Sequence, residues 1–340
     1  MAGCGCKWDF TITMLKKISA FYLKAGARCL AIVAVVVAAV FLVSCYSKPA
    51  QPLRLGSNLW PGYEPLYWAQ ESGDLKDIGV RLVELTSATE VLHAFRAGNL
   101  EMAALTLDEA LTLAADGIDI TVIWVMDISK GADALVFQPT LRRLELMKGA
   151  RIGLENTAVG ALMLHKALAK AGLTLRDIVP ITLTVDEHES AFYNGAVDGV
   201  VTFEPTKSKL IEMGGHEVFS SSDIYGDIID VLVIKTALVK ENQSRLHTLI
   251  RAFDKASRAI EQNSKGAISF VAKRMQIPES EVSKLYKHLE LGTIEHNQTL
   301  LSEKGAMQRR IEQTLALMNS ANLVHQPQVD LPVVSWSNEL

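Results

Sequence analysis

The segment HAFRAGNLE at residues 93–101 returns in altered form as SAFYNGAVD at residues 190–198. Both copies hold Ala-Phe, a glycine three residues after the phenylalanine, and an acid three residues after the glycine. Each copy is followed by a short apolar run that ends near a threonine, Thr106 in the first and Thr202 in the second. A helix, a glycine stop and a buried strand, repeated in this order, predict two similar α/β lobes.

Outside the repeat, short apolar segments alternate with amphipathic ones. Strands are expected at 53–56, 80–85, 102–105, 120–126, 151–154, 181–184 and 199–202. Helices are expected at 63–72, 90–97, 106–115, 158–171 and 187–194. From Asn242 onward nearly all of the chain is expected to be helical, with Pro278 opening one helix before Glu279. This alternation predicts an α/β fold with mostly parallel sheets covered by helices.

Three of the expected helix starts carry the residues of a capping box. These are Ser87-Ala88-Thr89-Glu90, Thr106-Leu107-Asp108-Glu109 and Asp186-Glu187-His188-Glu189. In open α/β sheets, ligands bind beyond the carboxyl ends of the strands, where such helices begin. Free backbone N–H groups at helix starts also attract anions. Two lobes facing each other across a cleft would bring several such ends to one small ligand.

Several segments, in this order and spacing, resemble the ABC-transporter solute-binding proteins of the nitrate/sulfonate/taurine type and their thiamine-pyrimidine-binding relatives. The segments are LRLG at 53–56, WPGYEPLYWA at 60–69, TLDEA at 106–110, GADAL at 131–135, DEH at 186–188 and TFEP at 202–205. The resemblance extends from about residue 53 to residue 320 and so covers most of the chain.

This resemblance implies a type II periplasmic-binding-protein fold, in which two α/β lobes close about a hinge, with additional C-terminal helices. Lobe 1 would comprise 53–136 and 230–325, lobe 2 would comprise 137–229, and 326–340 would form a C-terminal tail. The two chain crossings, near Phe137 and Ile229, would make the hinge. Such proteins close on a ligand and present it to a membrane permease driven by an ATPase.

The first candidate ligand contacts lie at strand ends and helix starts. Trp60 and Tyr63 flank a Pro-Gly turn and would form an apolar wall of the cleft. Ser87 and Thr89 would cap a helix and still leave N–H groups for a ligand. Thr157 holds the matching position in lobe 2, in a segment whose small residues let a ligand approach the backbone. A packed turn and ordinary helix caps are the structural alternatives.

Thr106 and four acids, Asp108, Asp133, Glu187 and Glu204, complete the candidate ligand-binding residues. Taken singly, each acid is explained by capping or by pairing with a helix dipole. Two of them in one cleft would repel a free sulfonate or nitrate and favour an amine. A carboxylate also accepts a hydrogen bond from a neutral ring N–H, as in a pyrimidine. Sulfonate, amine and pyrimidine-like ligands therefore all stay open.

The N-terminal segment has the pattern of a bacterial export signal. An uncharged run of 16 residues at 29–44 follows a basic segment, and it is shorter than the roughly 20 residues that span a bilayer. This favours a signal peptide at 1–44. The run ends LVSC, which resembles a lipobox and implies acylation of Cys45, with 45–52 as a lipidated linker. Two or three acyl chains would give a stable membrane anchor; a plain membrane anchor is the alternative.

Composition and motifs exclude several classes of function. The chain has 34 Lys and Arg against 38 Asp and Glu, which argues against nucleic acid as a partner. It has no cysteine after Cys45, no closely spaced histidine pair and no nucleotide-binding or nucleophile motif, so no metal, cofactor or catalytic residue is expected. We expect a monomeric, non-enzymatic receptor for an ABC importer. A receptor for a sensor kinase and a pyrimidine-synthase-like enzyme are the alternatives.

Overall fold

The computed structural model describes residues 51–155, 157–302, 306–324, 326 and 328–334. A compact unit begins at Pro52. The expected signal peptide at 1–44 and the acylation site Cys45 lie outside the described residues, as does most of the linker at 45–52. No helix in the described ranges has the length and apolar character needed to cross a membrane.

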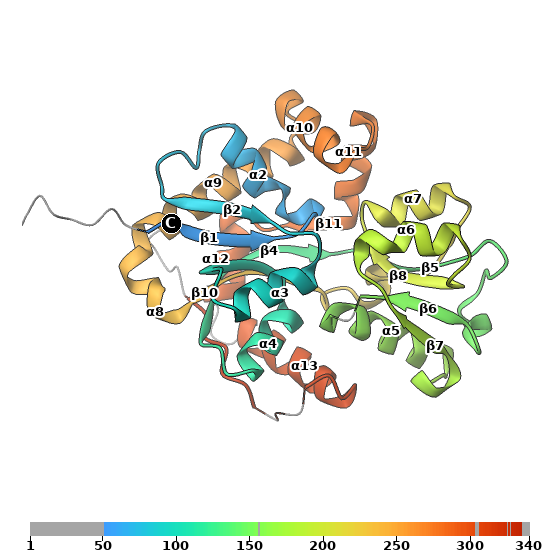
Figure 1. Cartoon of the computed structure of the whole chain (residues 1–340). Coiled ribbons are helices and arrows are strands. Elements are labelled where there is room, and N and C mark those ends of the chain that lie inside the picture. Colours follow the sequence, from blue (N-terminus) through green and yellow to red (C-terminus); the bar gives the residue numbers. More distant parts are fainter. Residues whose placement is uncertain (1–50, 156, 303–305, 325, 327, 335–340) are drawn as a thin grey trace, which may run out of the picture. The chain divides into compact units, whose positions relative to one another are not determined.

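The first sheet has six strands in the order β11-β4-β10-β3-β1-β2 (Figure 1). They are β1 (Leu53–Ser57), β2 (Val80–Glu84), β3 (Met102–Thr106), β4 (Ile120–Ser129), β10 (Ile229–Lys235) and β11 (Leu289–Leu291). β1 pairs in parallel with β2 and β3, whereas β10 runs antiparallel to both β3 and β4. All residues of β3 and β4 are buried, as expected for strands covered by helices on both faces.

The second sheet repeats this topology with five strands in the order β7-β6-β8-β5-β9. They are β5 (Asp133–Phe137), β6 (Arg151–Leu154), β7 (Val179–Thr182), β8 (Gly199–Phe203) and β9 (His216–Ser220). β6 pairs in parallel with β7 and β8, and β5 runs antiparallel to β8. β5 therefore holds the place in this sheet that β10 holds in the first.

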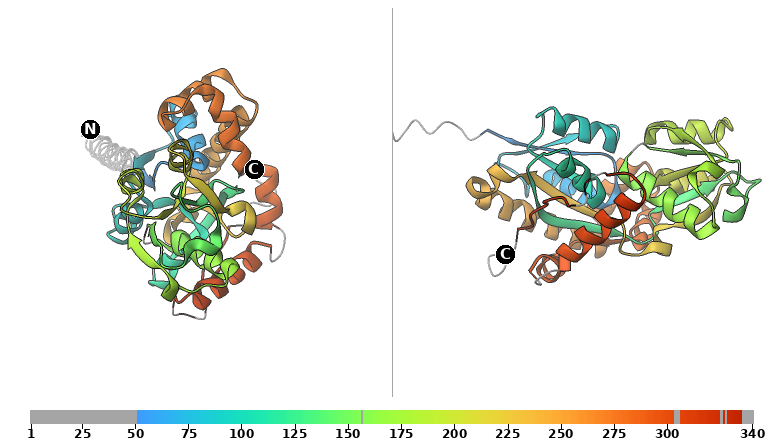
Figure 2. Two further views of the ribbon diagram at one scale, coloured as in Figure 1. Left: turned by 90° about the vertical axis from the view of Figure 1, so that its right-hand side faces the viewer. Right: turned by 90° about the horizontal axis from the view of Figure 1, so that it is seen from below.

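Helices cover the two sheets (Figure 1), and the last of them ends at Ser320. They are α2 (Glu64–Glu71), α3 (Ala88–Arg96), α4 (Leu107–Ala115), α5 (Ala158–Ala171), α6 (Val185–Tyr193), α7 (Thr206–Glu212), α8 (Thr236–Val239), α9 (Gln243–Glu261), α10 (Lys265–Met275), α11 (Glu279–Leu285), α12 (Ile294–Ser302) and α13 (Ala306–Ser320). α9 packs on α2 of the first lobe. α13, red in Figure 2, packs against α4 of the first lobe and α5 of the second.

The repeat seen in the sequence builds the same corner in each lobe. Arg54 donates from its backbone N–H and from Nε to Glu101, both at 2.9 Å, and from Nη2 to the carbonyl of the repeat glycine at 3.0 Å. Arg151 makes the same three contacts, at 2.7 and 3.1 Å to Asp198 and 2.8 Å to its own repeat glycine. The acid that ends each copy of the repeat therefore holds the first residues of β1 and β6 in place.

The first crossing between the lobes lies earlier than the sequence suggests. All five residues of β5 pair with β8 in the second sheet, so the chain crosses between Ser129 and Asp133. The boundary that placed 53–136 in lobe 1 is therefore wrong. β5 follows β4 without an intervening helix, so the sequence pattern gave no sign that the chain had changed sheets. On the return, Ile228 packs in the core of the second lobe and Ile229 in that of the first.

Two smaller expectations also need correction. α6 starts at Val185 with Thr184 as its N-cap, and Glu187 accepts hydrogen bonds from the Thr184 N–H and hydroxyl. Asp186 is thus inside the helix rather than at its cap. The C-terminal part is not entirely helical either, because the short strand β11 adds an edge to the first sheet.

Candidate functional site

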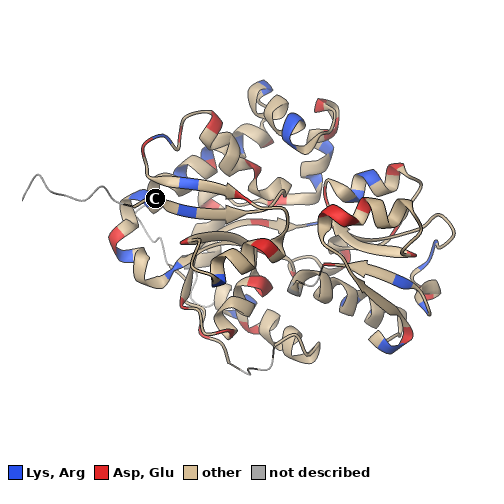
Figure 3. Cartoon of the chain, viewed as in Figure 1, with Lys and Arg blue, Asp and Glu red and all other residues tan. Residues whose placement is uncertain are grey.

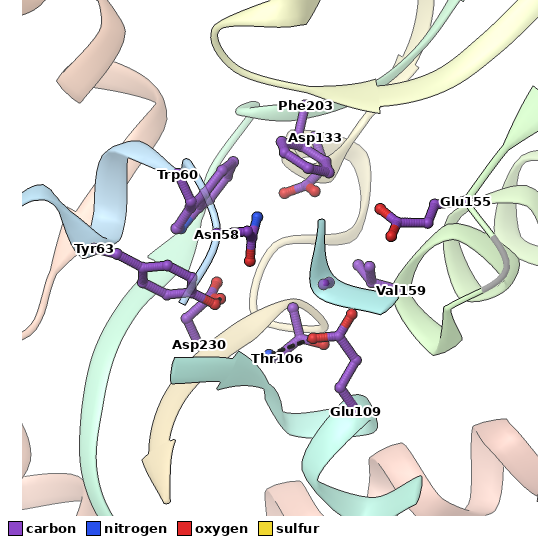
Figure 4. Close-up of a pocket in the computed structure, with 11 residues that line it drawn as sticks. Asn58, Trp60, Tyr63, Thr106, Glu109, Asp133, Glu155, Val159, Phe203 and Asp230 are labelled. Atoms are coloured by element: carbon purple, nitrogen blue, oxygen red, sulfur yellow. Dashed lines mark hydrogen bonds between the residues drawn. The ribbon is translucent and has the colours of Figure 1, made fainter. Parts of the chain in front are cut away.

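A pocket lies where the two lobes meet, and Figure 4 shows the side chains around it. It is lined by Asn58, Trp60, Tyr63, Ala88, Thr106, Glu109 and Asp230 from the first lobe, and by Asp133, Glu155, Val159 and Phe203 from the second. The cavity between these side chains measures about 30 Å³. The carboxyl ends of β1, β3, β6 and β8 all reach this pocket, which is where open α/β sheets bind ligands.

One wall of the pocket is aromatic and comes from both lobes. The rings of Trp60 and Phe203 meet edge to face, with centroids 5.6 Å apart. Trp60 also donates from Nε1 to Asp127 at 3.2 Å, which fixes the indole. A Cβ atom on Gly62 would lie 1.8 Å from the Asp127 carboxylate. The Trp-Pro-Gly turn therefore needs glycine so that the backbone can pass the buried acid.

The rest of the lining is mainly acidic. Burial, and then the neighbouring Asp108 carboxyl, raise the pKa of Glu109 to about 8. Burial also raises the pKa of Asp133 to about 7. The pKa of Asp230 is raised well above its ordinary value by burial and by the nearby Asp127 carboxyl. These groups share one poorly solvated space, where carboxylates without cations disfavour each other's charge.

Some carboxyl oxygens in the pocket have no hydrogen-bond partner among the described residues. Tyr63 donates to Asp230 Oδ1 at 2.5 Å, and the Thr106 N–H donates to Glu109 Oε2 at 3.1 Å. Glu109 Oε1 and Asp133 Oδ2 are buried without a hydrogen-bond partner in the described structure. The Thr106 hydroxyl belongs to the capping box of α4, and Asp230 lies beside the Asp127 carboxyl. Buried polar groups are nearly always satisfied in native proteins, so these two carboxyl oxygens are candidates for contact with a ligand.

The start of α3 is occupied by a carboxylate from the other lobe. Thr89 donates from its backbone N–H to Glu155 Oε1 at 3.0 Å and from its hydroxyl to the same oxygen at 2.7 Å. Ser87, fully buried, caps the helix by accepting from the Glu90 N–H at 3.3 Å. Ser87 and Thr89 therefore do not line the pocket directly. Thr89 is linked to the pocket by its hydrogen bonds to Glu155, which lines it.

A second space adjoins the pocket on the side of lobe 2. Asp133, Glu155, Val159 and Phe203 line both spaces, and the second adds Thr157 and His188 among others. The Thr157 hydroxyl and His188 Nε2 are buried without a partner. Burial lowers the pKa of His188 to about 4, so its ring is neutral at ordinary pH. Thr157 is thus placed near the cleft, as its sequence position suggested.

Three of the predicted acids lie outside the pocket lining. Asp108 and Glu204 are buried beside the cleft, and Glu204 accepts from the Ser208 N–H at the start of α7 at 3.1 Å. Glu187 is exposed and caps its own helix at Thr184. Glu187 was chosen because it lies near an expected helix start. In the structure the N-cap is Thr184, and the Glu187 carboxylate completes that capping box.

Seven lining residues were not among the sequence candidates: Asn58, Ala88, Glu109, Glu155, Val159, Phe203 and Asp230. Glu155 and Phe203 come at the carboxyl ends of expected strands and could have been found by that rule. Glu109 was assigned only to helix capping. Asp230 lies inside a strand that returns from lobe 2, which the local sequence pattern does not reveal.

No group of three or more His, Cys, Asp or Glu side chains in the described part of the chain is arranged to hold a metal ion. The pocket lining contains no Lys, Arg or His. Its chemistry is that of buried acceptors beside aromatic faces. It can bind N–H donors and positive charge.

The described fold and site define a class: two-lobed α/β proteins with a pocket between the lobes. The chain belongs to the NMT1-like family, whose model matches residues 47–276. This confirms the family resemblance expected from the sequence, and the arrangement of the two sheets confirms the expected periplasmic-binding-protein fold.

One relative in Escherichia coli (strain K12) bears the name "Putative aliphatic sulfonates-binding protein" and is 21% identical over 208 residues. That match covers 61% of this chain and 65% of the relative. Other matched proteins, named as binding proteins in Brucella, are 24% identical over 44% of this chain and 49% of their own length. The chain therefore spans less than two thirds of the curated relatives it matches.

Two solved structures show the same fold. The alkanesulfonate-binding protein SsuA from Xanthomonas axonopodis pv. citri, bound to MOPS, aligns with a TM-score of 0.72 at 19% identity, over 83% of this chain and 97% of that one. The ligand-binding component of an ABC-type import system from Staphylococcus aureus, with zinc bound, aligns with a TM-score of 0.67 at 12% identity. That alignment covers 83% of this chain and 97% of the other.

Proposed function

We propose that this protein is the solute-binding component of an ABC importer, which captures a small molecule between its lobes and passes it to a permease and its ATPase. The observation that carries the proposal is the pocket, because residues of both lobes line it at the carboxyl ends of four strands. The family match and the names of the relatives support the same role. We propose binding without chemical turnover.

The two chain crossings supply the pivot for closure. Ser221 Oγ lies 2.7 Å from Ser129 Oγ and accepts from the Gly131 N–H at 2.6 Å, which ties one crossing to the other. Two contacts join the lobes at the pocket, Thr89 with Glu155 and Trp60 with Phe203. Ligand binding in the cleft would favour the closed form by adding contacts to both lobes.

We further propose that the protein acts as a monomer outside the cytoplasm and is held to the membrane by acylated Cys45. The lipobox-like residues 42–45 support this step. Replacing Cys45 with serine should release the protein from washed membranes into the soluble fraction, and metabolic labelling with palmitate should disappear. Labelling of the C45S protein, or its retention on membranes, would overturn the lipid-anchor proposal.

The central test is ligand capture. The full-length protein, purified from its own host, is examined by native mass spectrometry for a bound small molecule that leaves unchanged on denaturation. A host strain that lacks the protein should lose uptake of that molecule. Chemical conversion of the molecule by the protein, or unchanged uptake without it, would contradict the proposed function.

A further inference from the structure

The charges around the pocket argue against an anionic ligand. Figure 3 colours acidic residues red, and several lie where the two sheets face each other. Four carboxyl groups line the pocket, those of Glu109, Asp133, Glu155 and Asp230, and no basic side chain does. The buried Lys207 is paired with Glu217 at 2.7 Å and donates to the Gly131 carbonyl at 2.7 Å. An anion entering this space would find no basic side chain in the lining and would be repelled by any of these carboxyls that is ionised.

Carboxylates of the protein itself occupy the starts of α3, α4 and α7, whereas the start of α5 at Thr157 has no side-chain cap among the described residues. Glu155 accepts a hydrogen bond from the N–H of Thr89 at the start of α3. Glu109 accepts a hydrogen bond from the N–H of Thr106, the N-cap of α4, and Glu204 accepts one from the N–H of Ser208 in α7. A helix N-terminus binds one negative group with its free N–H donors. At α3, α4 and α7 those donors serve to hold acids in place around the pocket.

We infer that the ligand is a small organic cation, such as a protonated amine or an amidinium, whose charged end lies between Glu109, Asp133 and Asp230. The inference rests on the proposed function and names the ligand class of the same site. Glu109 Oε1 and Asp133 Oδ2, which have no hydrogen-bond partner in the described structure, would accept its N–H groups. A bound cation favours the ionised form of these carboxyls, whose protons would be released to solvent. Trp60 and Phe203 supply ring faces and edges beside them, and a cation over an aromatic face gains further attraction.

The adjoining space suits a second polar atom of the same ligand. It is bounded by Thr157 and His188, whose hydroxyl and Nε2 lack partners. A ligand with a positive end at the acids of the first lobe and a neutral hydrogen-bonding group near Thr157 would touch both lobes. It would thereby satisfy the buried groups on each side of the cleft.

The experiment compares ligands of one shape and different charge. Benzamidine carries the positive charge, benzamide is its neutral counterpart, and benzenesulfonate is negative; butylamine and butanesulfonate form a second pair without a ring. Binding to the full-length protein is measured by calorimetry and by the shift in melting temperature. Ligands of this size can bind at about millimolar affinity or better. We expect the two cations to bind and the two sulfonates to give no signal.

Two variants assign the binding to the pocket. Glu109→Gln and Asp133→Asn keep the side-chain shape and remove charge, and each should weaken benzamidine at least about tenfold. Glu212→Gln, at the exposed end of α7, is the matched control and should leave the affinity unchanged. If Glu109→Gln fails to fold, as judged by circular dichroism, Asp133→Asn carries the test alone.

The possible failures are distinct. Binding of a sulfonate without either cation overturns the cation inference and leaves the solute-binding proposal standing. Equal binding of benzamide and benzamidine also overturns it, because charge would then not be recognised. If neither cation binds at about millimolar concentration the inference fails, and the solute-binding proposal is then judged separately by the molecule that the protein carries from its host.

Discussion

Glu155 of the second lobe accepts two hydrogen bonds from Thr89 of the first, one from the backbone N–H at 3.0 Å and one from the hydroxyl at 2.7 Å. The two residues are 66 positions apart in the sequence. The contact places a carboxylate at the positive end of α3, where the helix dipole stabilises it. It therefore links the lobes through the same group that lines the pocket.

Replacing Thr89 with valine should reduce the free energy of ligand binding more than the free energy of unfolding. The change keeps the shape and the backbone N–H but removes the hydroxyl donor to Glu155. A hydrogen bond to a charged group contributes about 1.5–3 kcal/mol, so the dissociation constant of a bound cation should rise by roughly tenfold or more. Calorimetry measures the ligand affinity, and thermal unfolding measures the stability. The control is Thr248→Val, on the exposed face of α9.

If the two variants bind the ligand with equal affinity, the Thr89 contact is absent from the ligand-bound form.

Trp60 and Phe203 should be energetically coupled in ligand binding. Their rings come from opposite lobes and meet edge to face, and such aromatic pairs contribute about 0.5–1.5 kcal/mol beyond area burial. A double-mutant cycle with Trp60→Leu and Phe203→Leu measures this coupling in the free energy of ligand binding. Trp124 and Phe253, centroids 6.3 Å apart within the first core, provide the control pair. The coupling of Trp124 and Phe253 should appear in the free energy of unfolding and be absent from the free energy of ligand binding. A coupling of Trp60 and Phe203 in ligand binding that is smaller than the experimental error would refute the prediction.

Gly62→Ala should disturb the turn that carries Trp60. The new Cβ atom would lie 1.8 Å from Asp127 Oδ2 and 2.6 Å from Trp60 Nε1, so the turn or the acid must move. Overpacking of this kind costs about 1–3 kcal/mol. Denaturant unfolding measures the loss, and tryptophan fluorescence reports the displaced indole. Adding Asp127→Ala should restore part of the stability; a further loss in the double variant would mean that the clash is not the cause.

The ligand-free protein should lose stability as pH rises from about 6 to about 8. The pKa values of Asp133 and Glu109 in the folded state are about 7 and about 8, above the ordinary carboxyl values of about 4. The folded protein therefore binds protons more tightly than the unfolded chain, and this contribution is lost as pH passes through those values. One pKa unit corresponds to about 1.4 kcal/mol. Denaturant unfolding at several pH values measures the slope.

The same groups give ligand affinity the opposite pH dependence. A cation should bind more tightly at pH 8 than at pH 6, because more of the carboxyl groups of Glu109, Asp133, Asp108 and Asp127 are then charged. Calorimetry with benzamidine checks this, since its own charge is constant over that range. The Asp133→Asn variant should flatten both profiles. Stability that rises toward pH 8 in the ligand-free protein would contradict the prediction.

The two lobes could be predicted from sequence because each copy of the repeat is a local unit of helix, glycine and strand. The glycines at 98 and 195 have φ of 75° and 65°, the left-handed conformation that ends a helix. Trp60, Tyr63, Thr106 and Asp133 were chosen from strand ends and helix starts, and all four line the pocket. Their role as ligand contacts stays a prediction.

What the sequence could not supply was pairing across the lobes. The position of Glu155 is set by its hydrogen bond to Thr89 of the other lobe. Asp230 lies at the pocket because β10 returns from the second sheet and pairs with β3. Glu187 was chosen because it lies near an expected helix start, but its carboxylate completes the capping box of that helix. The local sequence pattern therefore predicts helices and strands, but it does not predict which residues of the two lobes face each other.

The matching corners at Arg54 and Arg151 leave the two lobes alike at one end only. Both arginines lie near the amino ends of their strands, whereas the pocket lies at the carboxyl ends. At the carboxyl ends the lobes differ: the start of α3 receives Glu155 from the other lobe, whereas the start of α6 is capped by its own Glu187. Two similar frames with unlike facing edges allow the protein to hold a molecule whose two ends differ.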